Sequence, residues 1–529
     1  MLSFFAMVPI MIAIFLYILP SKKIARVLAV AAQLALTCGA FYLFLLCKEG
    51  DVIARIGNYG GVLGIVLKAD TLSSVFLILT SFIFLAVTVY NFRDGGSRLF
   101  WFFLFIWQGL INGIFLTRDM FNIFVLAEVL TVVVAVLLML DRNKRSMYDG
   151  MVYLMVNIVA MQFYLFGIGY MYKLTGVLDM DAAAQAIGLL DKSSLALPFA
   201  LIMTAISLKC ALMPMFSWFP NAYGTLSAPP AVSAILSGLH IKGSIYLFIR
   251  FQALFQEVSV PGFFLAIGIL TAVAGFLLSV SQSDVQLILA YSTVSQIGMV
   301  MIGLNVADVY SYTGSLYHLI NHALFKSALF LCAGVVTQAY GTRDIGKIRG
   351  VLRRYPAIGA ATIMAVLGIT GAPFFNGSIS KYFMMSGANF WLSTLLILIN
   401  LGTIIIFIKY AAMLFGRAGP GQAAVKIDKC KQAATLALGV VCFAGGIFGA
   451  QFVEFLFNVR VSVDVAGYFE KVALFVASGI AGYLLYKHYI RSGRLFLWIR
   501  EINFSFRWMC ASMGAFFAVM LLVIRLFAV

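Results

Sequence analysis

The chain has 529 residues, of which 63% are hydrophobic and 11% are charged, and its formal net charge is +17. This composition excludes a soluble globular protein and is typical of an integral membrane protein with many spans. No sizeable soluble domain is left over, so redox cofactors and nucleotide chemistry, where involved, belong to partner subunits.

About sixteen apolar segments reach the roughly 20 residues that a helix needs to cross a bilayer. In chain order they cover residues 2-19, 25-47, 70-91, 97-117, 119-140, 148-171, 195-218, 228-252, 260-281, 285-304, 312-338, 356-385, 389-416, 433-456, 467-488 and 505-527. The sequence therefore predicts an all-α polytopic membrane protein. The first span lacks a small-residue cleavage site and leads directly into the second, so we expect a retained helix rather than a signal peptide.

Basic residues gather in alternate connections between these spans. The clusters are Lys22, Lys23 and Arg26; Arg142, Lys144 and Arg145; Arg343, Lys347, Arg349, Arg353 and Arg354; Lys426, Lys429 and Lys431; and Lys487, Arg491, Arg494 and Arg500. The intervening connections, such as 173-194 with Asp179, Asp181 and Asp191, are neutral or acidic. This alternation is the positive-inside pattern of membrane proteins. It explains the positive net charge, so we do not expect nucleic acid as a partner. It predicts a prokaryotic cell membrane location with both termini outside.

The sequence offers no cofactor or metal motif. Its seven cysteines show no CxxC pair and no spacing that suits zinc or an iron-sulfur cluster. It also contains no phosphate-binding loop, no dinucleotide-binding glycine motif and no nucleophile, histidine and acid set. We therefore expect neither a cofactor nor catalytic chemistry in this chain.

Five ionisable side chains lie inside the apolar segments: Glu128, Lys209, Lys242, Lys326 and Lys381. A charge at the centre of a membrane helix costs roughly 2.5 to 3.5 kcal/mol on insertion scales, so five of them need a compensating function. The expected function is an ion or proton path.

Two spans are interrupted by proline or glycine. The first break follows Lys209 and contains Pro214, and the second contains Gly371 and Pro373 and precedes Lys381. Broken membrane helices are tolerated where protein or water covers the freed backbone groups. About five spans fit between the two breaks. Because five is an odd number, a second repeat of that size begins on the opposite side of the membrane and is therefore inverted. Matched breaks in inverted halves indicate a transport site.

Several motifs resemble the proton-translocating antiporter family, which comprises the antiporter-like subunits of respiratory complex I and their homologues in Mrp-type Na+/H+ antiporters and membrane-bound hydrogenases. The matching stretches are Asp119 to Glu128, Trp218 to Ala222, Ala228 to Ala234 before Lys242, Gln282 to Asp284, Leu289 to Gly298, and His318 to Lys326. The resemblance runs from about residue 50 to about 420. The motifs around Glu128 and Ala228 lean toward the Mrp and hydrogenase branch.

The resemblance implies a 14-helix core with two inverted five-helix repeats and broken helices, plus about two extra C-terminal helices. We expect N-terminal helices over 1-95, the repeats over 96-255 and 256-418, and C-terminal helices over 419-529. The segment from Arg491 to Arg507 suits an amphipathic helix at the membrane surface. Asn221, Gln286 and Leu287 depart from the family pattern, where an aspartate and basic residues are frequent.

Glu128 and Lys209 are predicted to form a switchable pair, because a nearby carboxylate favours the charged lysine while desolvation favours the neutral one. The alternative is a static ion pair that fixes helix packing. Lys242 is assigned to the centre of the path. Its neighbour His240 is expected to pack or to contact water rather than to be an obligatory carrier.

His318, His322 and Lys326 are spaced by four residues, which places them along one side of a helix. That spacing suits a chain of proton carriers, and hydrogen bonding across helices is the alternative for the histidines. Zinc is disfavoured because lysine is a poor ligand and the chain has only four histidines. The resemblance places Lys381 at the far end of the path, and the alternative is a lysine that snorkels to the headgroups.

The sequence thus predicts a proton-translocating subunit of an Mrp-type antiporter or an energy-converting redox complex. Protons would be taken up near Lys209, pass Lys242 and the His318 to Lys326 stripe, and leave near Lys381. The expected partners are other membrane subunits, the lipid bilayer and protons, with Na+ as a second candidate ion. A stand-alone secondary transporter and an inactive structural subunit remain alternatives.

Overall fold

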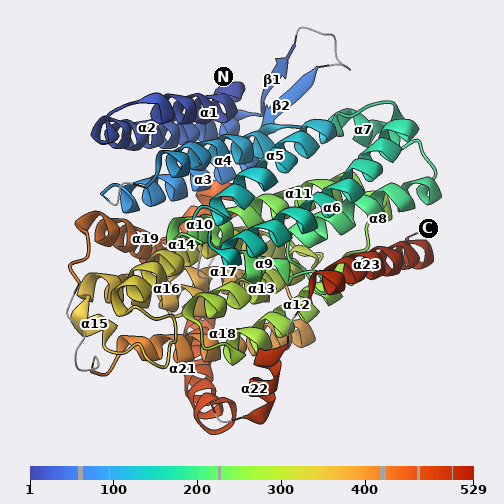
Figure 1. Ribbon diagram of the computed structural model, residues 1–529. Helices are drawn as coiled ribbons and strands as arrows, with labels where there is room; N and C mark the ends of the chain where they lie inside the picture. Colours follow the sequence, from blue (N-terminus) through green and yellow to red (C-terminus); the bar gives the residue numbers. More distant parts are fainter. Residues whose placement is uncertain are drawn as a thin grey trace.

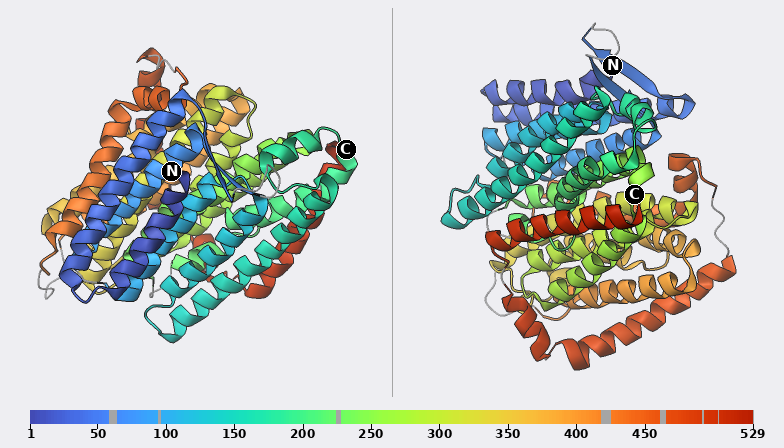
Figure 2. Two further views of the ribbon diagram at one scale, coloured as in Figure 1. Left: turned by 90° about the horizontal axis from the view of Figure 1, so that it is seen from above. Right: turned by 90° about the vertical axis from the view of Figure 1, so that its right-hand side faces the viewer.

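A computed structural model describes residues 1–57, 64–93, 96–223, 228–417, 425–460, 465–491, 493–502 and 504–528. It is a bundle of helices that lie side by side (Figures 1 and 2). Helices α1 and α2 form one end of the bundle, and α21 and α22 lie at the other (Figure 1). The central helices between these ends include α10, α13 and α14.

The first half of the chain begins with two helices and a strand pair and then continues as helices. The elements are α1 (Leu2–Ile18), α2 (Lys22–Glu49), β1 (Val52–Ile56), β2 (Ile65–Ala69), α3 (Thr71–Tyr90), α4 (Arg98–Leu116), α5 (Met120–Leu138), α6 (Lys144–Thr175), α7 (Met180–Ile187), α8 (Lys192–Lys209), α9 (Trp218–Tyr223) and α10 (Pro230–Ile235). A π-helical turn (Leu236–His240) joins α10 to α11 (Ile241–Leu254).

The rest of the chain is helical in the part that the structure describes. Its helices are α12 (Pro261–Ser281), α13 (Val285–Leu304), α14 (Val309–Tyr340), α15 (Val351–Arg354), α16 (Pro356–Thr370), α17 (Asn376–Ser386), α18 (Phe390–Ala411), α19 (Lys429–Ile447), α20 (Gly449–Phe457), α21 (Val465–Leu485), α22 (Arg494–Glu501) and α23 (Phe506–Phe527).

The helix starts follow from local sequence signals. Asp119 precedes α5 and accepts a hydrogen bond from the Asn122 backbone, and Asp284 caps α13 in the same way. Such side chains satisfy backbone N–H groups that have no partner within the helix. Pro230 and Pro356 are the first residues of α10 and α16. Proline lacks a backbone N–H, and at the first position of a helix that group would have no acceptor within the helix.

The prediction of an all-α polytopic membrane protein is confirmed. Within the described residues, fourteen helices are long and apolar enough to span a membrane, and α1 and α16 are two shorter apolar helices. Each of the sixteen predicted spans contains one of these helices or a broken pair. The bundle is therefore organised as the apolar segments indicate.

Three features of the connections between spans were not expected from the sequence: a strand pair and two short helices. Strands β1 and β2 pair antiparallel, with Val52 opposite Ala69 and Ile56 opposite Ile65. Helix α7 lies in the acidic connection after α6, and α15 lies in a basic one. All three are connections between spans, where hydropathy carries little information about structure.

The C-terminal helices pack on opposite flanks of the bundle. Helix α21 packs mainly against α18, whereas α23 packs against α8 and α6 (Figure 2). The short helix α22 lies between them in the chain, within the segment that the sequence identifies as amphipathic. The chain therefore crosses the outside of the bundle before it ends.

The two predicted breaks are present. Helix α8 ends at Lys209 and α9 begins at Trp218, while α16 ends at Thr370 and α17 begins at Asn376. Gly371 has a φ of +79°, a conformation that residues with a side chain rarely adopt. Each break therefore leaves a lysine close to irregular backbone inside the bundle.

Similar backbone contacts recur near the start of α5 and of α13. Met120 N–H donates to Leu178 O and Met180 N–H to Arg118 O, both at 2.9 Å. Val285 N–H and Ile345 N–H donate to Arg343 O and Ser283 O at the same distance. In each case the start of a helix is tied to the segment that follows the next long helix.

Candidate functional site

A line of basic side chains runs through the interior from α8 to α17. Lys242, His318, His322 and Lys326 have no exposed surface, Lys381 is 3% exposed and Lys209 is 7% exposed. Burial of isolated charges is costly, so such groups are either neutral or held by specific partners. Their partners therefore decide what this line can do.

Lys209, the last residue of α8, lies at one end of the line. Its Nζ is 3.3 Å from Thr131 Oγ1 and 3.4 Å from Asn157 Oδ1. Glu128 is half-buried on α5 and interacts with Lys209 electrostatically, but no ion pair within 4.0 Å joins these two described residues. Glu128 Oε1 has no hydrogen-bond partner among the described residues. The predicted pair is thus in an open arrangement.

His240 lies between Lys209 and the centre of the line. Its Nε2 is 3.3 Å from the Tyr153 hydroxyl on α6, and its ring is within electrostatic reach of Lys209. No described residue bonds to its Nδ1. The sequence did not assign a carrier between Lys209 and Lys242, and His240 with Tyr153 occupies that interval. The sequence signal was a histidine inside an apolar span, two residues before Lys242.

Lys242 is joined directly to α14. Its Nζ is 2.6 Å from His322 Nδ1 and also donates to the Ser237 carbonyl at 2.5 Å. Gly238 allows this approach, because a Cβ there would lie 2.1 Å from Ser327 Oγ on α14. His322 Nε2 has no hydrogen-bond partner among the described residues.

Lys326 leaves the stripe that the sequence predicts. Its Nζ donates to Leu289 O at 2.8 Å and to Ser292 Oγ at 2.5 Å, both on α13. It also lies 5.7 Å from the centre of the Phe407 ring. The Lys326 amine therefore contacts α13, and it lies within electrostatic reach of Lys242 and His322.

His318 connects α14 to the helix that carries Lys381. Its Nδ1 is 2.9 Å from Ser380 Oγ on α17, and its Nε2 is 3.0 Å from Gln296 Oε1 on α13. A ring protonated at Nε2 donates to Gln296 and accepts from Ser380. Ser380 and Gln296 were not identified as site residues from the sequence, because the pairing of helices distant in the chain is not visible there.

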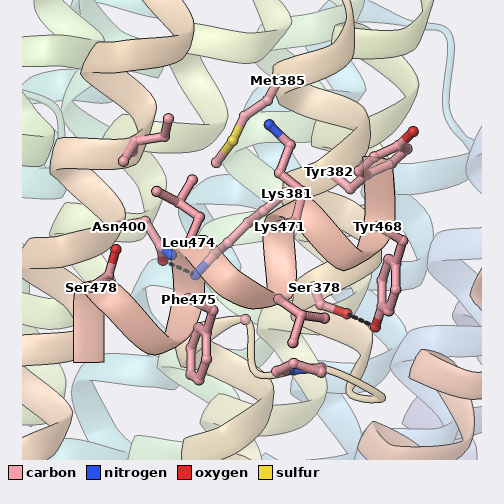
Figure 3. A pocket seen from close by; sticks show the side chains of 14 residues that line it. Ser378, Lys381, Tyr382, Met385, Asn400, Tyr468, Lys471, Leu474, Phe475 and Ser478 are labelled. Atoms are coloured by element: carbon pink, nitrogen blue, oxygen red, sulfur yellow. Dashed lines mark hydrogen bonds between the residues drawn. The ribbon is translucent and has the colours of Figure 1, made fainter. Parts of the chain in front are cut away.

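Lys381 ends the line next to the second break. Its Nζ donates to Ile369 O and to Asn400 Oδ1, each at 2.6 Å (Figure 3). The amine thus points into the protein rather than toward headgroups. A cavity of about 50 Å³ adjoins it, with Asn400, Tyr468 and Lys471 in its lining. A water needs roughly 10 to 15 Å³ of such space, so a few waters fit.

At the start of α13, Asp284 and Arg343 form an ion pair outside the spanning helices. Arg343 Nε is 3.0 Å from Asp284 Oδ2, and Gln286 Oε1 accepts from Arg343 at 2.7 Å. Burial raises the pKa of Asp284 against the opposing effect of Arg343. Gln286, which departs from the family pattern, therefore supports this pair.

Metal ligation is not supported where the structure describes the chain, since no group of three or more His, Cys, Asp or Glu side chains is close enough to hold an ion.

The fold and the buried line define a polytopic antiporter-like membrane protein. Residues 117–407, more than half of the chain, match the family described as NADH:quinone oxidoreductase/Mrp antiporter, TM. The chain belongs to this family.

Two relatives and one solved structure illustrate the likeness. An Na+/H+ antiporter subunit of Alkalihalophilus pseudofirmus is 29% identical over 72% of this chain and 79% of its own length. A subunit of the NADH-quinone oxidoreductase of Desulforudis audaxviator is 32% identical over 68% of this chain and 75% of its own. A chain of the Mrp complex from a Dietzia species superposes with a TM-score of 0.80 at 22% identity, covering 89% of this chain and 99% of that one.

Proposed function

We propose that this chain is a proton-translocating membrane subunit of a multisubunit complex, either an Mrp-type cation/proton antiporter or an energy-converting redox or hydrogenase complex. The observation that carries the proposal is a buried line of side chains: Lys242 contacts His322, the His322 and His318 rings lie 6.4 Å apart between their centres, and His318 contacts Ser380 on the helix of Lys381. Lysine and histidine gain and release protons, and desolvation of a lysine brings its two protonation states closer in free energy near neutral pH.

In the proposed route a proton is taken up near Lys209 and passes His240 to Lys242. It then moves along His322 and His318 and leaves near Lys381. Lys209 and Glu128 act as the switch, since closing the open pair would favour the protonated lysine. When Lys326 is protonated, it places a second charge near the centre and so biases where the proton rests.

The energy for this transport is proposed to come from neighbouring subunits. Glu128 is half-buried, and its helix also exposes Phe121, Val125 and Val129. A carboxyl group on such a surface at membrane depth is costly next to lipid. A partner subunit against this side of α5 would cover it and could change its distance from Lys209.

The orientation and the repeats are part of the proposal. Both termini lie outside the cell, which the alternating basic connections and an even number of spans support. The repeats cover 96-255 and 256-418, between N-terminal helices over 1-95 and C-terminal helices over 419-529. Their support is the matched pair of breaks and the recurring backbone contacts at Met120 and Val285. Impermeant labelling of a tag at each terminus tests the orientation.

The central test replaces Lys242 by methionine, which keeps the length of the side chain and removes its amine. We expect Lys242→Met to abolish proton transport, measured with a pH-sensitive dye in proteoliposomes that contain the intact complex. Lys173→Met, at an exposed lysine near the end of α6, is the matched control. Normal transport by Lys242→Met would favour an inactive structural subunit.

The cavity beside Lys381 is too small to hold a solute at that place. Its volume of about 50 Å³ is far below the roughly 300 Å³ or more of a small-molecule site. Solute uptake by the purified chain alone would support a stand-alone solute transporter and contradict the proposal.

A further inference from the structure

The cavity beside Lys381 has a wall that lies beyond the residues that match the family. Six residues of α21 line it: Tyr468, Lys471, Val472, Leu474, Phe475 and Ser478. Their spacing of three and four residues places them on one side of the helix. Other residues of α21, including Phe469, Val476 and Ile480, are exposed on the other side. One face of α21 therefore encloses the end of the proposed path.

Tyr468 is the contact between this wall and the second break. Its hydroxyl accepts a hydrogen bond from Phe374 N–H at 3.0 Å and lies 3.2 Å from Ser378 Oγ (Figure 3). Phe374 has a φ of +67° and belongs to neither α16 nor α17, so its N–H has no helical acceptor. At membrane depth such a group needs a partner from elsewhere in the protein.

The two lysines of the cavity point in different directions. The Lys381 amine reaches Asn400, whereas the Lys471 amine lies toward Met385 (Figure 3). The space between the walls holds only a few waters, and α21 packs mainly against α18. The Tyr468 hydroxyl is therefore a polar tie between a lightly packed helix and the segment that carries Lys381.

We propose that Tyr468 is a positioning residue at the outlet of the path, and that it seals the α21 wall against the second break. In this arrangement the Lys381 ammonium passes its proton to a water of the cavity, which leaves a neutral amine and a hydronium ion. The tyrosine fixes where that water can lie and which side of the membrane the water can reach. This inference rests on the proposed function, because it assumes that protons leave at Lys381.

The first test compares Tyr468→Phe with Tyr483→Phe in the intact complex. Both variants lose one phenol hydroxyl from α21, but Tyr483 is exposed and far along the helix from the break. We expect Tyr468→Phe to lower driven transport roughly three- to tenfold, the effect of one hydrogen bond. It should also move the outside pH at which transport is half-maximal, while Tyr483→Phe changes neither quantity.

A second test measures access to the cavity. Ser478→Cys is placed in a variant without the seven native cysteines and exposed to a membrane-impermeant maleimide from outside. Adding Tyr468→Phe should raise the labelling rate severalfold, because the seal is lost, whereas adding Tyr483→Phe should not. Unchanged labelling would overturn the inference and leave Tyr468 as a packing residue. So would a lower transport rate whose dependence on the outside pH is unchanged.

The proposed function has its own control in the same assay. If Lys381→Ala abolishes transport while Tyr468→Phe behaves like Tyr483→Phe, the inference fails and the path stands. If Lys381→Ala transports normally, the outlet lies elsewhere and both fail.

Discussion

Lys242 on α11 and His322 on α14 share a 2.6 Å hydrogen bond between Nζ and Nδ1 at a place that solvent does not reach. A protonated lysine can donate to a neutral Nδ1, whereas two cations at this distance would repel strongly in a medium of low dielectric constant. The pair therefore accommodates one excess proton, which either residue can hold. This is the property of a relay station.

His322→Ala should lower proton transport by roughly 100-fold, the scale at which loss of a positioned acid-base group acts. The reason is that Lys242 then has no proton acceptor on α14. The control is His488→Ala, at an exposed histidine at the end of α21. Dye-monitored transport in proteoliposomes, normalised to assembled protein, measures both. Equal rates for the two variants would remove His322 from the path.

Glu128→Gln should impair coupled transport by about tenfold and leave the complex assembled. The amide keeps the volume of the carboxyl group but cannot draw a proton to Lys209. Glu470→Gln, at an exposed position on α21, controls for the loss of an acidic side chain. A wild-type rate in assembled Glu128→Gln complex would contradict the switching role and leave packing as the function of this residue.

Lys209→Ala and Lys381→Ala should each reduce transport severely, and the double variant should be little worse than the poorer single one. Groups that act in series are strongly non-additive because losing either already stops the flow. Lys381→Glu should retain more activity than Lys381→Ala, since a carboxyl group can still carry a proton at that depth. Independent, multiplying losses in the double variant would indicate two separate paths.

Asp70, just before α3, should make stability depend on pH. It accepts from Arg118 at 2.7 Å and from Arg250 at 2.6 Å, and its side chain also caps α3 through Ser73. Burial alone would raise the pKa of Asp70, but the charge and hydrogen bonds of Arg250, with smaller contributions from Ser73 and Arg118, lower it from 3.8 to about 2.

Because the folded pKa is below the unfolded one, this stabilisation is present above about pH 4 and disappears as the pH falls toward 2. Asp70→Asn should therefore cost about 2 kcal/mol at pH 7 and almost nothing near pH 2. Thermal unfolding of the solubilised protein over this range measures the difference. Asp51→Asn, in a more exposed ion pair with Lys68, should show little effect at either pH.

The sequence was sufficient for the spans and for the titratable residues inside them. Hydropathy located each membrane-spanning helix, and the broken helices at Pro214 and Pro373 were visible as interruptions. The hairpin Val52–Ile56 with Ile65–Ala69 was missed because two short strands between membrane spans leave only a weak alternating pattern.

The contacts of the site were less predictable. Helical spacing correctly aligned His318 and His322, but it could not show that Lys326 turns to α13 or that Ser380 meets His318. Those contacts depend on which helices become neighbours. The family resemblance supplied the order of the stations, and the structure supplied their partners.

Gly238→Ala should disturb the Lys242 station through packing alone. A methyl group at residue 238 would lie 2.1 Å from Ser327 Oγ, so the turn that contains residue 238 and α14 must separate. We expect a loss of roughly 1 to 3 kcal/mol in stability and slower transport. Ser327→Ala removes the clashing oxygen, so the double variant should regain much of both. Failure of this rescue would show that the glycine serves the backbone of the turn instead.

The wide turn at Leu236–His240 has a geometrical consequence for the helix that contains it. A π turn holds one residue more than an α turn, so every residue after it lies about 100° behind its position in an uninterrupted α-helix. His240, the last residue of this turn, contacts Tyr153 on α6, and Lys242, two residues later, contacts His322 on α14. The span works as two helices with different phases joined end to end, so a helical wheel drawn through residues 230 to 254 would assign its far half to the wrong neighbours.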